Sequence, residues 1–173
     1  MKTYIHYGST TFDRNMILPI TEITFGYPYN KPNTGLWASD INAEYGWREW
    51  CESSGFRDCD ESNSFKFRIR YPHTIFTIET IEDAIRFIKA YHRPHIDNRQ
   101  PIRYCSVDEL IQTIKTRNCA LYHVLPDFKK MNDDGYSGLE ITLSKNYGIF
   151  YDLFYSWDCD SIVVWNPDEI IVI

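Results

Sequence analysis

Two short stretches, Y-I-H-Y-G-S at residues 4–9 and G-L-W-A-S-D at residues 35–40, each join a glycine to β-forming residues. In the first stretch a strand over residues 2–7 runs into Gly8, and in the second Gly35 opens a strand over residues 35–38. A glycine at such a point predicts a sharp corner, because it adopts backbone conformations that other residues avoid.

Six further strands are predicted from hydrophobic patterning. Residues 64–70 alternate Phe65, Phe67 and Ile69 with basic residues, which is typical of a half-buried strand. The other strands are expected at residues 74–78, 120–124, 139–143, 161–165 and 169–173. Loops are expected at residues 27–34 and 57–63, and an irregular connection at residues 146–157.

Three helices are expected between these strands. Asp40 is a candidate N-cap for a helix that runs through about Ser53. A second helix covers residues 80 to about 91, and Ser106 with Glu109 forms a capping box for a third helix through Arg117. Because the order of elements is not an alternation of strand and helix, the pattern predicts an α+β fold with a mainly antiparallel sheet.

Composition bounds the class of protein. With 173 residues, 43% of them hydrophobic, the chain fits one domain over residues 1–173. A net charge of −6 and a pI near 5.3 leave no broad basic surface, so a protein partner is expected before a nucleic acid. No apolar run reaches the roughly 18 residues of a membrane span, and a cytoplasmic protein without a membrane partner is expected.

The cysteines and the absent motifs narrow the chemistry further. Five cysteines at irregular spacing fit neither a paired disulfide framework nor a metal site, so we expect reduced thiols and no metal. Sequence signatures of P-loop proteins, Rossmann folds, α/β-hydrolases and zincins are missing. Aromatic residues make up 16% of the chain, and their rings suit both a core and a pocket for flat ligands.

Three blocks together resemble a known superfamily: H-Y-G-S at residues 6–9, G-L-W-A-S-D at 35–40 and D-S-I-V-V-W-N-P-D-E-I at 160–170. In order and coarse spacing they are similar to the ADP-ribosyltransferases of the poly(ADP-ribose) polymerase and diphtheria-toxin-like branch, the H-Y-E type. The resemblance implies a split antiparallel β core with surrounding helices. It also implies an NAD-dependent mono-ADP-ribosyltransferase, a glycosyltransferase-class enzyme like those among bacterial and phage toxins and defence effectors.

The resemblance assigns residues to NAD, which is a co-substrate in this family. They are His6, Tyr7, Gly8, Ser9, Trp37, Tyr45 and Trp47. The family histidine directly precedes the glycine, whereas here Tyr7 separates His6 from Gly8. Because neighbouring side chains in a strand point to opposite faces, only one of the two can orient the ribose. Aromatic faces suit the flat nicotinamide cation, and a glycine corner offers backbone groups to its carboxamide.

Asp160 falls where the family carries its catalytic glutamate, so it is the first candidate for the acid, together with His6 as the second catalytic residue. A carboxylate against the ribose stabilises the oxocarbenium character that develops as the bond to nicotinamide breaks. Asp158 shares that strand face if the strand extends backwards. Glu140 and Glu169 are further candidates.

Three functions remain open at this point. The first is a transferase that modifies a macromolecular acceptor, with a neutralising protein as a further partner. The second is a degenerate member of the same fold that binds NAD, a nucleotide or a protein without turnover, since Asp160 is shorter than glutamate. The third is a Cys–His hydrolase, for which the sequence offers no signature around any cysteine.

Overall fold

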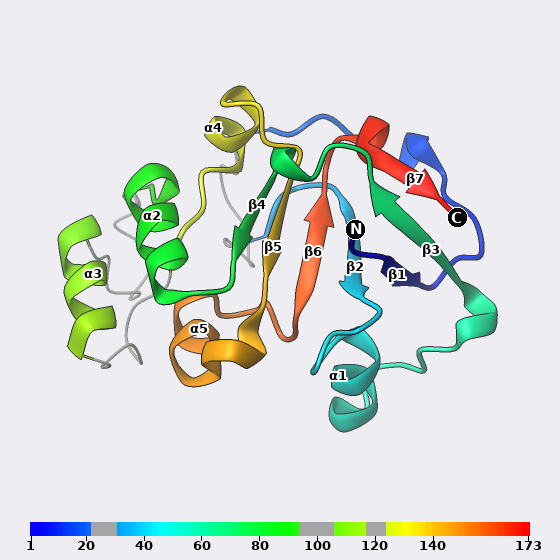
Figure 1. Cartoon of the computed structure of the whole chain (residues 1–173), viewed down its shortest axis with the longest axis horizontal. Helices are drawn as coiled ribbons and strands as arrows, with labels where there is room; N and C mark the ends of the chain where they lie inside the picture. Colours follow the sequence, from blue (N-terminus) through cyan, green and yellow to red (C-terminus); the bar gives the residue numbers. More distant parts are fainter. Residues whose placement is uncertain (22–30, 94–105, 117–123) are drawn as a thin grey trace, which may run out of the picture.

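The computed structural model describes residues 1–21, 31–93, 106–116 and 124–173 (Figure 1). Its strands form one seven-stranded sheet in the order β4-β5-β6-β2-β1-β3-β7. They are β1 Tyr4–Tyr7, β2 Leu36–Asp40, β3 Ser64–Ile69, β4 Ile75–Ile78, β5 Gly138–Ile141, β6 Ser161–Val164 and β7 Ile170–Val172. Only β4 and β5 pair in parallel. The predicted α+β class with a mainly antiparallel sheet is therefore confirmed.

Five α-helices lie in the described residues: α1 Trp47–Ser54, α2 Ile81–Tyr91, α3 Val107–Thr116, α4 Phe128–Asp133 and α5 Tyr147–Leu153. The Thr80 hydroxyl accepts the Asp83 N–H at the start of α2, and Ser106 with Glu109 forms the reciprocal pair that opens α3. Figure 1 shows α2, α4 and α5 near β4 and β5, with α1 next to the β1–β2 end. None of these helices is long and apolar enough to cross a membrane.

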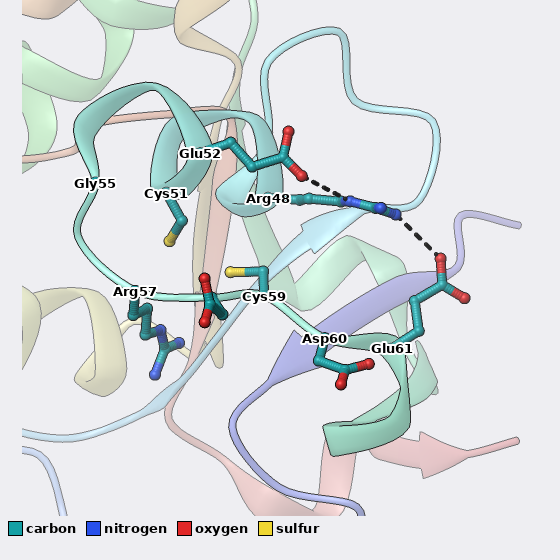
Figure 2. Close-up of a pocket in the computed structure, with 9 residues that line it drawn as sticks. Arg48, Cys51, Glu52, Gly55, Arg57, Cys59, Asp60 and Glu61 are labelled. Atoms are coloured by element: carbon teal, nitrogen blue, oxygen red, sulfur yellow. Dashed lines mark hydrogen bonds and ion pairs between the residues drawn. The ribbon is translucent and has the colours of Figure 1, made fainter.

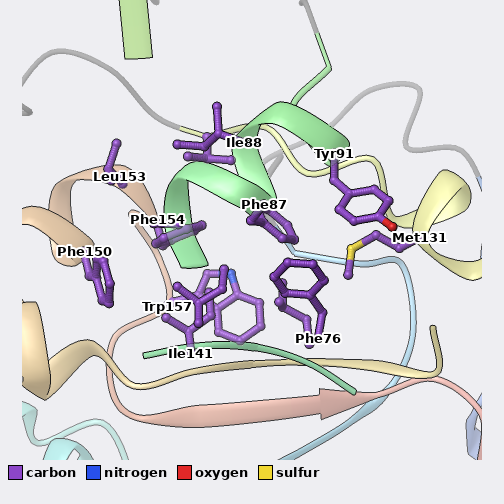
Figure 3. Close-up of a cluster of buried hydrophobic side chains, with 14 of the residues drawn as sticks. Phe76, Phe87, Ile88, Tyr91, Met131, Ile141, Phe150, Leu153, Phe154 and Trp157 are labelled. Atoms are coloured by element: carbon purple, nitrogen blue, oxygen red, sulfur yellow. The ribbon is translucent and has the colours of Figure 1, made fainter. Parts of the chain in front are cut away.

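Alternation along the strands produces two hydrophobic clusters. The helix-side cluster joins Leu139, Ile141 and Val163 of the sheet to rings on α2 and α5 and to Trp157 (Figure 3). The inner cluster takes Tyr4, Phe67 and Ile162 from the opposite face. It also contains Ile75 of β4 and Ile170 of β7, which belong to the two edge strands, so the sheet must curl until its edges approach each other.

The sheet is continuous, but its pairing is weakest between β1 and β2. These strands share two residue pairs, Tyr4 with Asp40 and Ile5 with Ser39, whereas β1 and β3 share four. Beyond Ile5 the imidazole of His6 bonds the Trp37 carbonyl oxygen. The described strands therefore form one curled sheet, which opens between β1 and β2 towards Gly8 and Gly35.

Two sequence predictions are wrong. Asp40 does not cap a helix: it ends β2, and its carboxylate accepts the Asn42 N–H in a local turn. The helix starts at Trp47, where Glu49 accepts the N–H of Gly46. Residues 146–157 are not irregular, because α5 occupies their first half. The strand expected at residues 120–124 and much of the loop at 27–34 fall outside the described residues.

Candidate functional site

Arg57 connects three residues that the resemblance assigns to NAD. Its Nη2 donates to the carbonyl oxygen of Tyr7 at 3.1 Å, and its guanidinium carbon lies 5.9 Å from the centre of the Trp47 ring. Gly8 has φ +111°, and a Cβ atom at this position would lie 3.3 Å from Arg57 Nη1. We call this set of Tyr7, Gly8, Trp47 and Arg57 the Arg57 corner.

Local structure fixes the rest of the corner. The N–H of Gly8 donates to the Asn63 carbonyl at 2.8 Å, which holds the turn after β1 against β3. Ser9 Oγ donates to the Thr11 carbonyl at 2.7 Å and so serves its own turn. Tyr7 is buried, and burial raises the pKa of its hydroxyl above the ordinary value. The Tyr7 carbonyl is the backbone acceptor that Arg57 uses in this corner.

His6 lies on the inner face of β1, beside the ring of Phe65. Its Nδ1 is 2.7 Å from the Trp37 carbonyl oxygen, so Nδ1 must carry the proton and donate. Burial lowers the pKa of His6 below 6.5, and the imidazole is neutral at pH 7 with an acceptor left at Nε2. A neutral imidazole of this tautomer can accept one hydrogen bond from a ribose hydroxyl.

Trp37 projects to the opposite face from His6. Its ring packs against the helix-side cluster, 4.8 Å from the centre of the Trp157 ring. Lys31 Nζ lies 5.2 Å above the Trp37 ring and 3.7 Å from the Asp158 carboxylate. Burial raises the pKa of Asp158, and the Lys31 ammonium opposes that shift. Trp37 is therefore brought together with Asp158 and not with the Arg57 corner.

Asp160, Tyr45 and Trp47 meet around a residue that the sequence reasoning missed, Ser39. The Asp160 N–H donates to the Tyr45 carbonyl at 2.9 Å. Ser39 Oγ donates to the Asp160 carbonyl at 2.7 Å and accepts the Trp47 N–H at 2.9 Å. These bonds tie the head of β6 to the start of α1. The Tyr45 hydroxyl itself turns away to Ser53.

The carboxylate of Asp160 is held from the other side. It accepts the N–H of Ser144 at 2.8 Å and the Ser144 hydroxyl at 2.6 Å, and the residue is only 6% exposed. This carboxylate lines a pocket of about 280 Å³ that also contains Glu140. We call it the acid pocket, because five carboxylates and two lysines are among its lining residues. Two of the predicted acids thus share one cavity.

Glu140 is a buried acid whose two carboxylate oxygens both accept hydrogen bonds from side chains. Its two carboxylate oxygens accept from Lys2 Nζ at 2.9 Å and from the Tyr4 hydroxyl at 3.2 Å. Burial raises the pKa of Glu140, and the contacts with Lys2 and Tyr4 oppose that shift. Glu79 bonds both Lys2 and Lys145, and the hydrogen bond from Lys145 is the main reason that the pKa of Glu79 is lowered. Glu140, Lys2, Glu79 and Lys145 thus form one chain of ion pairs.

Glu169 serves the fold instead of a site. Its Oε2 accepts the Tyr71 N–H at 3.0 Å and its carbonyl accepts the Arg70 N–H at 2.8 Å, which fastens the end of β3. The side chain is buried and not solvated. Among the residues that the structure describes, no group of three His, Cys, Asp or Glu side chains is arranged to hold a metal ion.

Arg57 had no signal in the sequence, because a basic residue in a polar loop is usually solvated. Comparison with known proteins adds nothing to the local geometry: no family model, curated protein or solved structure matches the chain. The roles suggested for His6, Tyr7, Gly8, Ser9, Trp37, Tyr45, Trp47 and Asp160 stay predictions.

Proposed function

We propose that this protein is an NAD-dependent mono-ADP-ribosyltransferase whose nicotinamide subsite is the Arg57 corner. The observation that carries the proposal is the occupant of that corner. A guanidinium is a planar cation with N–H donors, and here it lies over the Trp47 ring while donating to the Tyr7 carbonyl. The nicotinamide of NAD is also a planar cation with an N–H donor, so it could make the same ring contact and the same hydrogen bond in this corner.

Binding of nicotinamide then requires Arg57 to leave. The ring replaces the guanidinium over Trp47, and the carboxamide N–H replaces Nη2 at the Tyr7 carbonyl. Arg57 is exposed and its loop is polar, so it can return to water at little cost. Arg57 is in this sense an internal competitor of the co-substrate.

The order of strands supports the proposal independently. The three blocks of the resemblance are far apart in sequence, yet β1, β2 and β6 are consecutive neighbours in the sheet. Asp160 stands at the head of β6, two hydrogen bonds from the Trp47 backbone through Ser39. For transfer, its carboxylate would leave Ser144 and turn toward the ribose, where negative charge stabilises the oxocarbenium-like transition state. His6 Nε2 is proposed to accept from a ribose hydroxyl.

The acceptor is proposed to be a protein. The net charge of −6 opposes close approach of a nucleic-acid backbone, and the acid pocket adds local negative charge. A basic protein segment would approach this surface with favourable electrostatics. Transfer to such an acceptor breaks the ribose–nicotinamide bond and releases neutral nicotinamide. It forms a bond from the ribose carbon to the acceptor side chain, which gives up a proton to water.

A second candidate function, NAD binding without turnover, is favoured by one observation. Both oxygens of Asp160 already bond Ser144, and the residue is almost fully buried. An acid held in this way must exchange its partners before it faces a ribose. If it does not, the protein binds the dinucleotide and leaves it intact.

Incubation with NAD labelled in its adenosine part, with and without cell lysate, separates the candidates. Label on protein supports the transferase. Label on nucleic acid supports the transferase activity but overturns the proposal of a protein acceptor. Free ADP-ribose alone indicates that the protein only hydrolyses NAD. Intact NAD that still raises the melting temperature supports the binder, since a ligand of the folded state stabilises it. Intact NAD with no change in melting temperature overturns both.

A further inference from the structure

Two free thiols lie side by side next to the loop that carries Arg57. Cys51 is buried on α1, and Cys59 is half-buried on the segment that returns along this helix. The Cys59 thiol donates to the Trp47 carbonyl oxygen, with the sulfur 3.8 Å from it. Trp47 precedes Cys51 by one helical turn, so both sulfurs lie against the same turn of α1. Figure 2 shows the two side chains directed toward each other.

Both thiols also line a pocket that small reactants can enter. Its volume is about 640 Å³, and charged side chains line it together with the two cysteines, among them Arg48, Arg57 and Glu61 (Figure 2). The segment between the cysteines is exposed and turns at Gly55, where φ is +65°. A reactant in this pocket reaches Cys59 first, because Cys51 is 1% exposed.

We propose that Cys51 and Cys59 are a redox pair that a low-molecular-weight disulfide converts into an intramolecular disulfide. The Cys59 thiolate attacks one sulfur of the small disulfide, forms a mixed disulfide and releases one thiol. The Cys51 thiolate then attacks the Cys59 sulfur and releases the second thiol. Two cysteine thiols are oxidised, one small disulfide is reduced, and the two cysteine protons end on the released thiols.

The disulfide would fasten the Arg57 loop to α1. Arg57 lies between the two cysteines in sequence, and its contacts with Tyr7 and Trp47 depend on the course of this loop. Cross-linking residues 51 and 59 removes most of the loop's freedom to carry Arg57 away. The disulfide chemistry is independent of the proposed function; only its consequence for nicotinamide binding rests on it.

The environment of Cys59 sets the rate. Burial, with a further contribution from Cys51, raises the pKa of Cys59 to about 11. The thiolate is the attacking species, so the protein is expected to react slowly at neutral pH. Its rate should rise about tenfold per pH unit between about pH 7 and pH 10, as the thiolate fraction grows.

Peptide mapping tests the pairing directly. The full chain is incubated with oxidised glutathione, its remaining thiols are blocked, and it is digested with trypsin without a reductant. Trypsin cleaves after Arg48, Arg57 and Lys66, so the two cysteines fall in separate peptides, 49–57 and 58–66. We expect these peptides to be linked, with a mass two hydrogens below their sum. Cys159→Ser, the matched control at a neighbouring buried thiol, should keep the link, and Cys59→Ser should abolish it.

Three outcomes overturn the proposal: glutathione that stays on Cys59, a link from Cys51 to Cys159, or no modification even at high pH. The fastening has its own readouts. Oxidation should raise the melting temperature by roughly 5 °C and slow native tryptic cleavage after Arg57 several-fold. A linked protein that is cleaved as fast as the reduced one shows that the disulfide does not hold the loop, which overturns that part. Failure of NAD binding in both redox states would count against the proposed function alone.

Discussion

The Arg57 corner and the acid pocket differ in the sign and in the exposure of their charged groups. The corner holds one exposed cation between an aromatic ring and a backbone carbonyl. The acid pocket buries Glu140 against Lys2 and Tyr4, and Asp160 against Ser144. An exposed, weakly held cation exchanges for another cation at little cost, whereas a buried charge that loses its partner is penalised heavily. The corner is therefore suited to binding a ligand, and the pocket to holding preorganised negative charge.

The largest expected effect concerns the acid pocket. Asp160→Asn should lower the rate of ADP-ribosyl transfer on the order of 100-fold, because a carboxylate that stabilises a cationic transition state acts mainly there. NAD binding, measured by the shift in melting temperature, should persist. Ser144→Ala is the matched control, since it removes a partner of Asp160 and leaves the charge; it should cost at most about tenfold. Equal losses in both variants would make Asp160 a structural group.

The next effect concerns the aromatic wall of the corner. Trp47→Ala should weaken nicotinamide binding about tenfold, the scale of one cation–π contact together with its buried area. Isothermal titration with nicotinamide mononucleotide, which carries the cationic ring, measures the change. Trp50→Ala is the control, because the Trp50 ring packs edge-on against Trp47 and the guanidinium stacks on Trp47 itself. If Trp50→Ala weakens binding equally, the ring of Trp47 is not the contact.

Arg57 itself should act in the opposite direction. Arg57→Ala removes the internal competitor, so the affinity for the same mononucleotide should rise about three- to tenfold. Arg57→Lys keeps a cation but loses the planar guanidinium. The affinity of this variant for the mononucleotide should lie between those of the parent protein and of Arg57→Ala. A fall in affinity on Arg57→Ala would show that the guanidinium binds the ligand and does not compete with it.

The smallest effect is a pair of opposing pH dependences in the acid pocket. The pKa of Glu140 is raised by burial, so the folded state keeps this proton to higher pH, and its contribution to stability falls as pH rises above about 4.5. The pKa of Glu79 is lowered mainly by Lys145, so its stabilisation is present above about 4.5 and is lost as pH falls below it.

Urea unfolding as a function of pH measures both contributions. Glu140→Gln should remove the decline above pH 4.5, and Glu79→Gln should remove the loss below it. The double variant should lack both. Parallel changes in the two single variants would show that the shared lysine, Lys2, couples the two carboxylates into one titrating unit.

Much of the fold was predictable because its signals are local. The alternation of Phe65, Phe67 and Ile69 marks β3, and all three side chains are buried as expected. The caps at Thr80 and Ser106 start their helices where the sequence places them. Asp40 misled the prediction, because a short acidic side chain caps a turn as readily as a helix. Helix α5 was missed, because its apolar and aromatic residues do not repeat at a clear helical spacing.

The candidate site was predictable only in parts. The sequence nominated Tyr7, Gly8 and Trp47, and the structure brings them together. It also nominated Trp37 and Asp160 for the same pocket, and they separate: Trp37 joins the helix-side cluster and Asp160 the acid pocket. Strand alternation decides which face a side chain takes, and a resemblance in short blocks carries no information on the local twist and pairing.

By itself, then, the sequence determined the α+β class, most strands, two helix starts and the glycine corner at the end of β1, because each depends on a few neighbouring residues. Only the tertiary structure decided that β6, β2 and β1 are neighbours, that Ser39 links Asp160 to Trp47, and that Arg57 occupies the corner. These are contacts between segments far apart in the chain. They form when the sheet curls and buries its inner cluster, which draws residues from six of the seven strands.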